Sequence, residues 1–306
     1  MGFIHKKNTT VKPNGKAGRQ RRKIKHISGA FLAPSFLGVL TFFFAPFIVV
    51  IVYSVVDNPV SMNFVGLDNF VKLINNTAFK QAVRNTLRFS AIAVPLAVVL
   101  SLLLALVLQW KIPLRSQFRT FFLSPMMVPV ASVVLVWQVL FDYNGAVNQW
   151  LSFIGVENKI DWLKSSYGTI VIVILFLWKN LGYNMILFMA ALSNIPQELV
   201  EVAVLEKASQ FQIFWHVKLR YMTSTVLFVT IMSLINSFKV FREVYLLTGD
   251  NPTDWIYMLQ HYMNNMFRKL NYQNLSAAAI LMSLFMIVVI GILFLIENYF
   301  GKDVEG

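Results

Sequence analysis

Two long apolar runs of the sequence are interrupted by side chains that can bind a polar solute. Lys179 and Asn180 are adjacent in one run, and Ser233, Asn236 and Ser237 recur at intervals of three and four in another. Side chains at these intervals share one face of an α-helix. At about 1.5 Å per residue, Lys179 lies roughly 16 Å into its helix, near the centre of a bilayer. Amide, hydroxyl and ammonium groups at one depth predict a hydrophilic cavity that binds its ligand through hydrogen bonds.

The charge of a lysine at this depth must be stabilised by other groups. Placing its charge at the bilayer centre costs about 2.5 to 3.5 kcal/mol on insertion scales, so Lys179 should face protein or a wet cavity. Whether it holds helices together through a neighbouring carbonyl or contacts a ligand stays open. Lys239 and Glu243 lie one turn apart in the other run and can pair. We expect the long basic side chains there to extend to the membrane interface instead, with a role in a gate as the alternative.

Covalent catalysis is not indicated by the sequence. The chain has no cysteine, and its four histidines are scattered. It contains no G-x-x-x-x-G-K-[S/T] loop, with which P-loop proteins hold ATP phosphates. We therefore expect no catalytic site, no metal site and no directly bound cofactor.

The elements that must position the polar groups are membrane helices. The 306 residues are 57% hydrophobic and only 13% charged, unlike an average soluble protein. Six apolar runs are near or above the ~20 residues that a spanning helix needs. These runs are about 30–56, 85–110, 120–141, 169–193, 222–247 and 274–298. Because lipid offers no water to unpaired backbone groups, we predict an all-α membrane protein with six transmembrane helices.

The net charge of +13 comes largely from one end of the chain. Nine Lys and Arg residues precede the first run with no acidic residue among them, and the loop after the second run is purely basic. This distribution is typical of the positive-inside rule and of anionic lipid contact, rather than of nucleic-acid binding. We predict a basic cytoplasmic tail over residues 1–28, a transmembrane domain over 29–306, and both termini in the cytoplasm.

The third run contains Pro125 and Pro129, four residues apart near its predicted cytoplasmic end. Each proline removes a backbone hydrogen bond and clashes with the preceding turn, so the helix should bend or open here. An ordinary kink and a hinge or cavity wall are equally compatible with this pattern.

The segment between the fourth and fifth runs, residues 194–221, is amphipathic and acidic. Its apolar residues share part of one helical face, and its glutamates lie outside that face. The apolar residues are Leu199, Val202, Ala203 and Leu205, and the glutamates are Glu198, Glu201 and Glu206. A helix that only lies on lipid carries basic residues on its polar side. The glutamates therefore indicate that this segment docks on a protein.

The same segment resembles the EAA loop of ABC importer permeases. The similarity includes Ile195-Pro196, Glu201-Val-Ala203 and Glu206-Lys207-Ala208-Ser209. It extends along the chain through the motifs FVGLDNF, RNTL, FRTFFLSPMMVP, DWL, WKNLGYNM and NSFKVFREVYLLTGDNP. In order and spacing these motifs are similar to the carbohydrate-type permeases, which implies the transmembrane domain of a type I ABC importer with cytoplasmic coupling helices.

The resemblance implies that the segment is inserted into a cleft of a separate ATPase subunit. The positions implied to couple are Glu198, Glu201, Val202, Ala203, Leu205, Glu206, Lys207 and Ala208. Lys207 stands where the family has glycine, and Arg220 stands where it has proline. Lysine adopts the left-handed turn that glycine permits only at some cost, so we expect the bend between the two short helices to differ.

The resemblance also implies which residues contact the substrate. By alignment these are Met126, Val130, Asn180, Ser233, Ser237 and Val240. Lys179, Asn236 and the aromatic Tyr183 complete the predicted substrate site, since sugars need paired polar groups beside apolar or aromatic surfaces. If Lys179 faces the cavity, we expect it to favour an acidic saccharide.

These expectations describe the bacterial inner-membrane permease subunit of an ATP-driven importer of oligosaccharides or related sugars. Its implied partners are a second homologous permease, two ATP-binding cassette subunits that hold ATP and Mg²⁺, and an extracytoplasmic solute-binding protein. The alternative is a secondary transporter of a small polar solute, driven by an ion gradient, which would need intramembrane carboxylates. The central runs contain none, because Glu243 and Glu297 are placed near helix ends.

Overall fold

The computed structural model describes residues 32–110, 113–250 and 252–301. Within these ranges the regular structure is helical, apart from an isolated bridge between Val56 and Phe64. The predicted tail, residues 1–28, lies outside them. In chain order the helices are η1 (Leu40–Phe44), α2 (Ala45–Ser54), α3 (Asp68–Asn75), α4 (Thr77–Val107), α5 (Arg115–Met127), α6 (Val130–Leu140), α7 (Ala146–Phe153), α8 (Gly168–Ser193), α9 (Gln197–Leu205), α10 (Gln210–Ile213), η2 (Phe214–Lys218), α11 (Leu219–Tyr221), α12 (Thr223–Phe238), α13 (Phe241–Thr248), α14 (Leu259–Arg268) and α15 (Tyr272–Gly301).

Within the described residues, five helices are long and apolar enough to cross a membrane, and α5 with α6 makes a sixth if this bent pair is one span. The five are Leu32–Ser54, Thr77–Val107, Gly168–Ser193, Thr223–Thr248 and Tyr272–Tyr299. The six predicted runs are therefore recovered. The second helix begins at Thr77 rather than near residue 85, because the Asn76 side chain caps it by accepting a hydrogen bond from the Phe79 amide at 3.0 Å.

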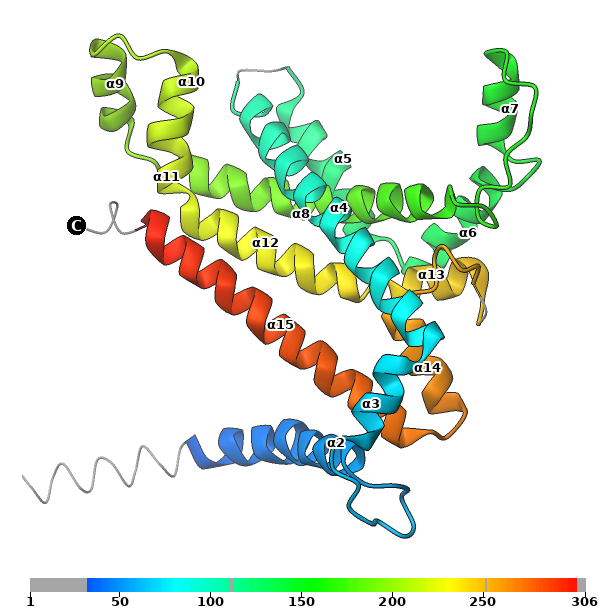
Figure 1. The fold of residues 1–306 in the computed structure, drawn as a ribbon. Coiled ribbons are helices and arrows are strands. Elements are labelled where there is room, and N and C mark those ends of the chain that lie inside the picture. Colours follow the sequence, from blue (N-terminus) through cyan, green and yellow to red (C-terminus); the bar gives the residue numbers. More distant parts are fainter. Residues whose placement is uncertain (1–31, 111–112, 251, 302–306) are drawn as a thin grey trace, which may run out of the picture.

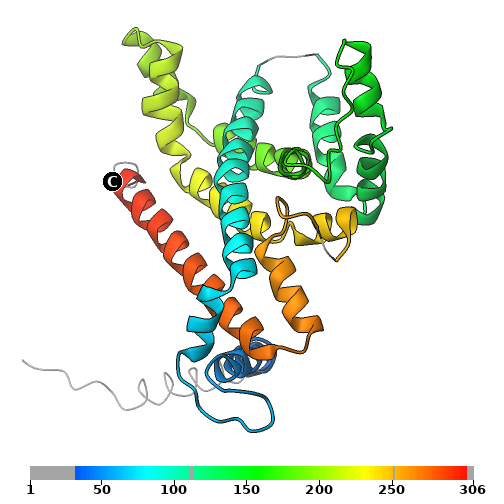
Figure 2. The ribbon, with the colours of Figure 1, turned by 45° about the vertical axis from the view of Figure 1, so that its right-hand side comes forward.

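A row of small residues on α4 lets α8 pack closely against it. Ala93, Ala97, Ser101 and Ala105 recur every four residues, and each is fully buried. Side chains at this interval form one ridge along a helix, and small ridges allow two membrane helices to approach through their backbones. Figures 1 and 2 show α4 crossing α8 near the centre of the molecule, with α12 beside them.

The span made by α5 and α6 is broken at its prolines, as the sequence predicts. The two helices meet at an angle of 100°. Pro125 lies inside α5, and Pro129 is the N-cap residue that precedes α6, where its carbonyl accepts from the amides of Ser132 and Val133. Because proline has no amide hydrogen to donate, the α5 helix ends before it and a new helix starts in another direction.

The amphipathic segment forms a helical hairpin that projects from the bundle. Figures 1 and 2 show α9 and α10 at the same end of the molecule as the C-terminal end of α15. Between α9 and α10, Lys207 has a φ of 60°, in the left-handed region. Ser209 then caps α10 in a reciprocal pair of hydrogen bonds with Gln212. Lys207 thus adopts the conformation for which glycine is the favoured residue.

The first span lies apart from the bundle formed by α4, α8 and α12. In both views α2 runs away from these helices, and its contacts are mainly with α15 and with η1, which precedes it. Large apolar side chains are exposed around it, among them Phe42, Phe43 and Phe47. Such a helix is covered by lipid or by another membrane protein.

Candidate functional site

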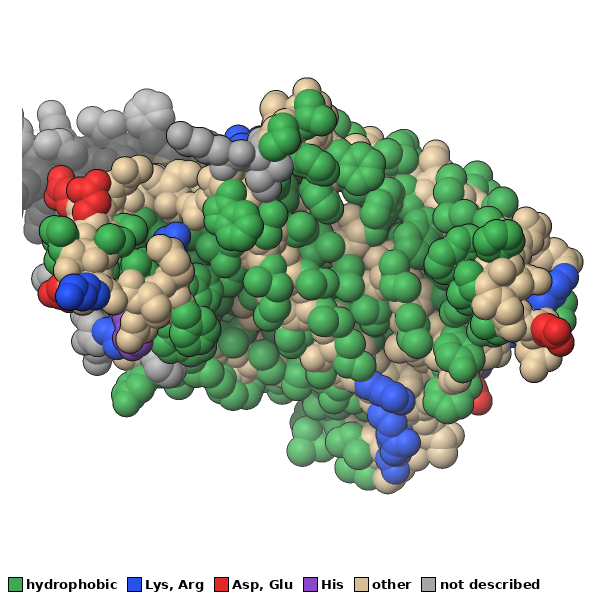
Figure 3. Space-filling model, turned by 90° about the horizontal axis from the view of Figure 1, so that it is seen from above, with side chains coloured by type: hydrophobic (Ala, Val, Ile, Leu, Met, Phe, Trp, Pro, Cys, Tyr) green, Lys and Arg blue, Asp and Glu red, His purple; other side chains and the backbone are tan. Residues whose placement is uncertain are grey.

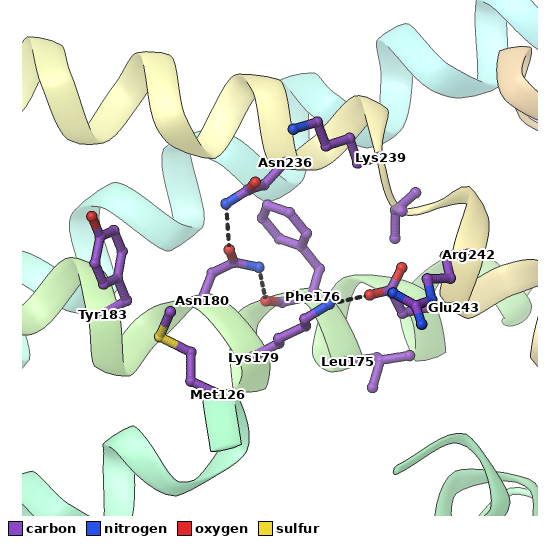
Figure 4. A pocket seen from close by; sticks show the side chains of 11 residues that line it. Met126, Leu175, Phe176, Lys179, Asn180, Tyr183, Asn236, Lys239, Arg242 and Glu243 are labelled. Atoms are coloured by element: carbon purple, nitrogen blue, oxygen red, sulfur yellow. Dashed lines mark hydrogen bonds and ion pairs between the residues drawn. The ribbon is translucent and has the colours of Figure 1, made fainter. Parts of the chain in front are cut away.

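A cavity of about 390 Å³ lies between α5, α8 and the junction of α12 with α13. Figure 4 shows side chains from these segments gathered around it. They are Met126, Leu175, Phe176, Lys179, Asn180, Tyr183, Asn236, Lys239, Val240, Arg242 and Glu243. The wall therefore includes six residues of the predicted substrate site, namely Met126, Lys179, Asn180, Tyr183, Asn236 and Val240. Met126 lies in the last turn of α5, directly before the bend, and it lines the cavity. The bend at Pro125 and Pro129 therefore forms part of the cavity wall.

Two amide side chains bridge α8 and α12 across the cavity floor. Asn236 Nδ2 donates to Asn180 Oδ1 at 3.0 Å, and Asn180 Nδ2 donates to the Phe176 carbonyl at 2.8 Å (Figure 4). Each amide has two N–H donors and an oxygen with two lone pairs, so both keep hydrogen-bonding capacity beyond this bridge. The bridge can therefore bind the hydroxyl groups of a ligand.

Lys179 is neutralised by a carboxylate from another helix. Figure 4 shows its ammonium paired with Glu243, which lies in the first turn of α13. The Lys179 side chain is 38% exposed and that of Glu243 only 8%. Glu243 therefore pairs with Lys179 on another helix and not with Lys239, its neighbour one turn away.

Ser233 and Ser237 lie on a different side of α12 from Asn236 and do not line the cavity. Asn184 Nδ2 donates to Ser233 Oγ at 3.0 Å, and the Ser237 hydroxyl lies 2.8 Å from that of Ser90. Residues at intervals of three and four spread over an arc of the helix surface, and here the arc faces two neighbours. Ser233 and Ser237 were predicted to lie in the substrate site. In the structure they instead form hydrogen bonds that connect α12 with α8 and α4.

Val130 is also outside the cavity. It begins α6 and packs in an apolar cluster with Val133, Val134 and Trp137. The 100° bend turns α6 away from the α5 end that carries Met126. Residues four apart would share one face of a straight helix, whereas the bend separates Met126 from Val130 here.

Gly182 is a residue of the site that the sequence analysis did not single out. A Cβ atom at this position would lie 1.8 Å from the carbonyl oxygen of Phe122 on α5. The backbone of α5 therefore touches α8 here, two residues from the cavity residue Asn180. A glycine inside the apolar run that contains WKNLGYN was the available signal, since an interior helix glycine often marks a close approach.

The projecting hairpin exposes apolar as well as acidic side chains. Leu205 is 82% exposed, Phe211 73% and Val202 53%. Figure 3 shows acidic and basic side chains collected where α9 and α10 project, while apolar side chains cover the middle of that face. An exposed surface that mixes apolar and charged groups outside the apolar body is typical of a protein contact.

Membrane-length helices around a polar cavity, with an amphipathic hairpin at one end, define a membrane transport component. Residues 97–306 match the family described as "Binding-protein-dependent transport system inner membrane component", and the chain belongs to this family. It is a multi-pass permease subunit of the inner membrane, and it works in a transport system that depends on a binding protein.

Among similar proteins is the arabinooligosaccharides transport system permease protein AraP of Halalkalibacterium halodurans, with 30% identity over 72% of this chain and 70% of its own. The multiple sugar-binding transport system permease protein MsmF of Streptococcus mutans is 27% identical over 80% and 83%. A crystal structure of a bacterial ABC transporter involved in the import of the acidic polysaccharide alginate contains a chain of the same fold. Its TM-score is 0.79 at 22% identity, and the match covers 94% of this chain and 100% of that one.

Proposed function

We propose that this chain forms half of the translocation pathway of an ATP-driven oligosaccharide importer. The observation that carries the proposal is the cavity, where the Asn180–Asn236 bridge shares a wall with Tyr183 and Phe176. Amides bind sugar hydroxyls, and aromatic rings pack against the apolar faces of sugar rings. The names of AraP and MsmF, which refer to arabino-oligosaccharides and multiple sugars, support the same substrate class.

A second, homologous permease would supply the other half of the pathway. The cavity wall of this chain is exposed at Met126, which is 58% accessible, and at Lys179. A pathway for a saccharide needs walls on all sides, because a sugar that crosses the bilayer must exchange its water for protein groups. The heterodimer supplies the missing side.

The α9–α10 hairpin would dock on an ATP-binding cassette subunit through Glu198, Glu201, Val202, Ala203, Leu205, Glu206, Lys207 and Ala208. Because the sequence has no P-loop, ATP and Mg²⁺ would be bound by that partner and not by this chain. Closure of two ATPase subunits would move the hairpin as a rigid body and turn the cavity from one side of the membrane to the other. The hairpin end would be cytoplasmic, and the solute-binding protein would approach from the opposite end.

The proposal is tested with the complex reconstituted in liposomes with its binding protein. We expect ATP-dependent uptake of an oligosaccharide, and we expect sugar-loaded binding protein to stimulate ATP hydrolysis. Glu201→Lys reverses a charge on the exposed hairpin and should reduce this stimulation by about tenfold or more, as loss of a charged contact does at an interface.

A matched control is Glu157→Lys, which reverses the same charge in the loop after α7, far from the hairpin. This variant should keep full stimulation. Normal stimulation in Glu201→Lys, with the protein inserted and the complex intact, would contradict the docking of α9. Uptake that continues without ATP but stops with an ionophore would contradict the importer itself.

A further inference from the structure

The wall of the cavity carries an excess of positive charge. Lys179, Lys239 and Arg242 are cationic, and Glu243 is the one carboxylate among the lining residues described above. Glu243 is paired with Lys179, so these two charges cancel. Two cations therefore remain on this wall without a compensating group.

Lys239 and Arg242 have no carboxylate within ion-pair distance in residues 32–110, 113–250 and 252–301. Both lie at the junction where α12 ends and α13 begins, three residues apart, and both side chains are exposed to the cavity. Figure 4 shows Lys239 on the side of Asn236, near the amide bridge, and Arg242 beside Glu243, with Lys179 between it and the bridge.

Unpaired cations inside a membrane-spanning wall are unfavourable unless an anion or water compensates them. A guanidinium binds a carboxylate through two parallel hydrogen bonds, and an ammonium adds a point charge of the same sign. Neighbouring amides bind hydroxyl groups. This combination matches a ligand that carries both hydroxyls and carboxylates.

We propose that the cavity selects acidic oligosaccharides, built from uronic-acid units, and that Arg242 and Lys239 bind their carboxylates. The proposal rests on the importer function proposed above and names its substrate class. It also replaces the expectation that Lys179 makes this selection, because Lys179 already has Glu243 as its partner.

The test compares two sugars that differ only in charge: an oligogalacturonide and a galactose oligomer of equal length and linkage. Uptake is measured with the reconstituted complex, and binding to the permease–ATPase complex is measured without the binding protein, which has a selectivity of its own. We expect the unmodified complex to prefer the acidic sugar. Lys239→Gln with Arg242→Gln should lower its affinity about tenfold or more, as loss of charge-assisted hydrogen bonds does, and leave the neutral sugar unchanged.

Two further variants keep the result interpretable. Lys239→Arg with Arg242→Lys preserves both charges and should keep the acidic preference, whereas Lys164→Gln removes a surface charge outside the cavity and should change nothing. Equal loss for both sugars in the Gln variant would show that the cations bind the partner subunit and would overturn the proposal. Efficient uptake of the neutral sugar alone would overturn it and leave the importer function standing. If no sugar is carried with ATP, the importer function fails, and the inference fails with it.

Discussion

At the scale of single residues, the pair of Lys179 and Glu243 joins α8 to α13 where water is scarce. Lys179 is partly open to the cavity, so water screens some of its charge, whereas Glu243 is almost fully buried. Such pairs add little net stability, because desolvation offsets the attraction, but removal of one partner leaves the other uncompensated. The pair therefore fixes the position of α13 on the cavity wall.

This asymmetry predicts coupled mutational effects. Lys179→Met and Glu243→Gln should each destabilise the purified complex by about 2 kcal/mol, below the range for fully buried pairs because Lys179 is partly exposed. The double variant should lose less than the sum of the two. Thermal unfolding of the three variants in detergent measures this coupling. Losses that add without any coupling would show that the two side chains do not stabilise each other.

His261 predicts how stability depends on pH. It is buried in α14, its ring is edge-on to Phe241 at 4.6 Å, and its Nδ1 accepts from the Met258 amide at 3.4 Å. Burial lowers the pKa of His261 to about 4 from 6.5. The folded protein then keeps the ring neutral, while the unfolded chain binds a proton below pH 6.5. The contribution of the neutral His261 ring to the free energy of unfolding should be complete above pH 6.5. It should fall by up to about 3 kcal/mol as the pH drops toward 4.

The measurement is the melting temperature of the complex between pH 4 and 8, compared with His261→Gln. The glutamine variant has no proton to bind at this position, so its dependence on pH should be flatter over that interval. Parallel curves for the two proteins would assign the pH dependence to other groups.

At the scale of elements, Gly182 sets the distance between α5 and α8. Gly182→Ala would place a methyl group against the Phe122 carbonyl, and neither helix backbone can yield without moving Met126 in the cavity wall. We expect this variant to lose transport and to fail in assembly, an effect of several kcal/mol typical of overpacking. Gly291→Ala on α15 is the matched control, because a Cβ there meets nothing within 4 Å. Membrane yield, melting temperature and uptake report the outcome, and normal assembly of Gly182→Ala would contradict the close approach.

Most helices could be predicted from the sequence because their signals are local. The lengths of the apolar runs predict the membrane spans, and Pro125 and Pro129 predict the bend. The periodicity of residues 197–205 predicts α9. The direction of a side chain depends instead on how a helix is rotated against its neighbours, which no local pattern encodes. Asn236 faces the cavity for this reason while Ser233 faces α8.

The pairing of Glu243 with Lys179 could not be predicted for a related reason. The two residues are far apart in the sequence, and they meet because α12 ends at Phe238 and α13 continues from a new start. A continuous helix would have suggested the Lys239–Glu243 pair one turn apart instead. The break itself has no proline or glycine to announce it, so the tertiary contact overrides the local pattern.

At the scale of the whole molecule, the two ends differ in chemistry. One end carries the α9–α10 hairpin, with exposed apolar and acidic groups, and the opposite end carries α3 and α14 (Figures 1 and 2). Between them the surface is largely apolar, and α2 stands apart from the bundle. A chain of this shape leaves its cavity open at one side, so its function belongs to an assembly.

The ridge of Ala93, Ala97, Ser101 and Ala105 has a consequence for how such an assembly can move. Large side chains of α8, among them Phe176 and Phe188, pack closely against these small residues, so the two helices resist sliding past each other. The α4–α8 pair would then behave as a fixed frame during the transport cycle. Motion would be concentrated at the two interrupted helices, where α5 meets α6 and α12 meets α13, and both interruptions border the cavity.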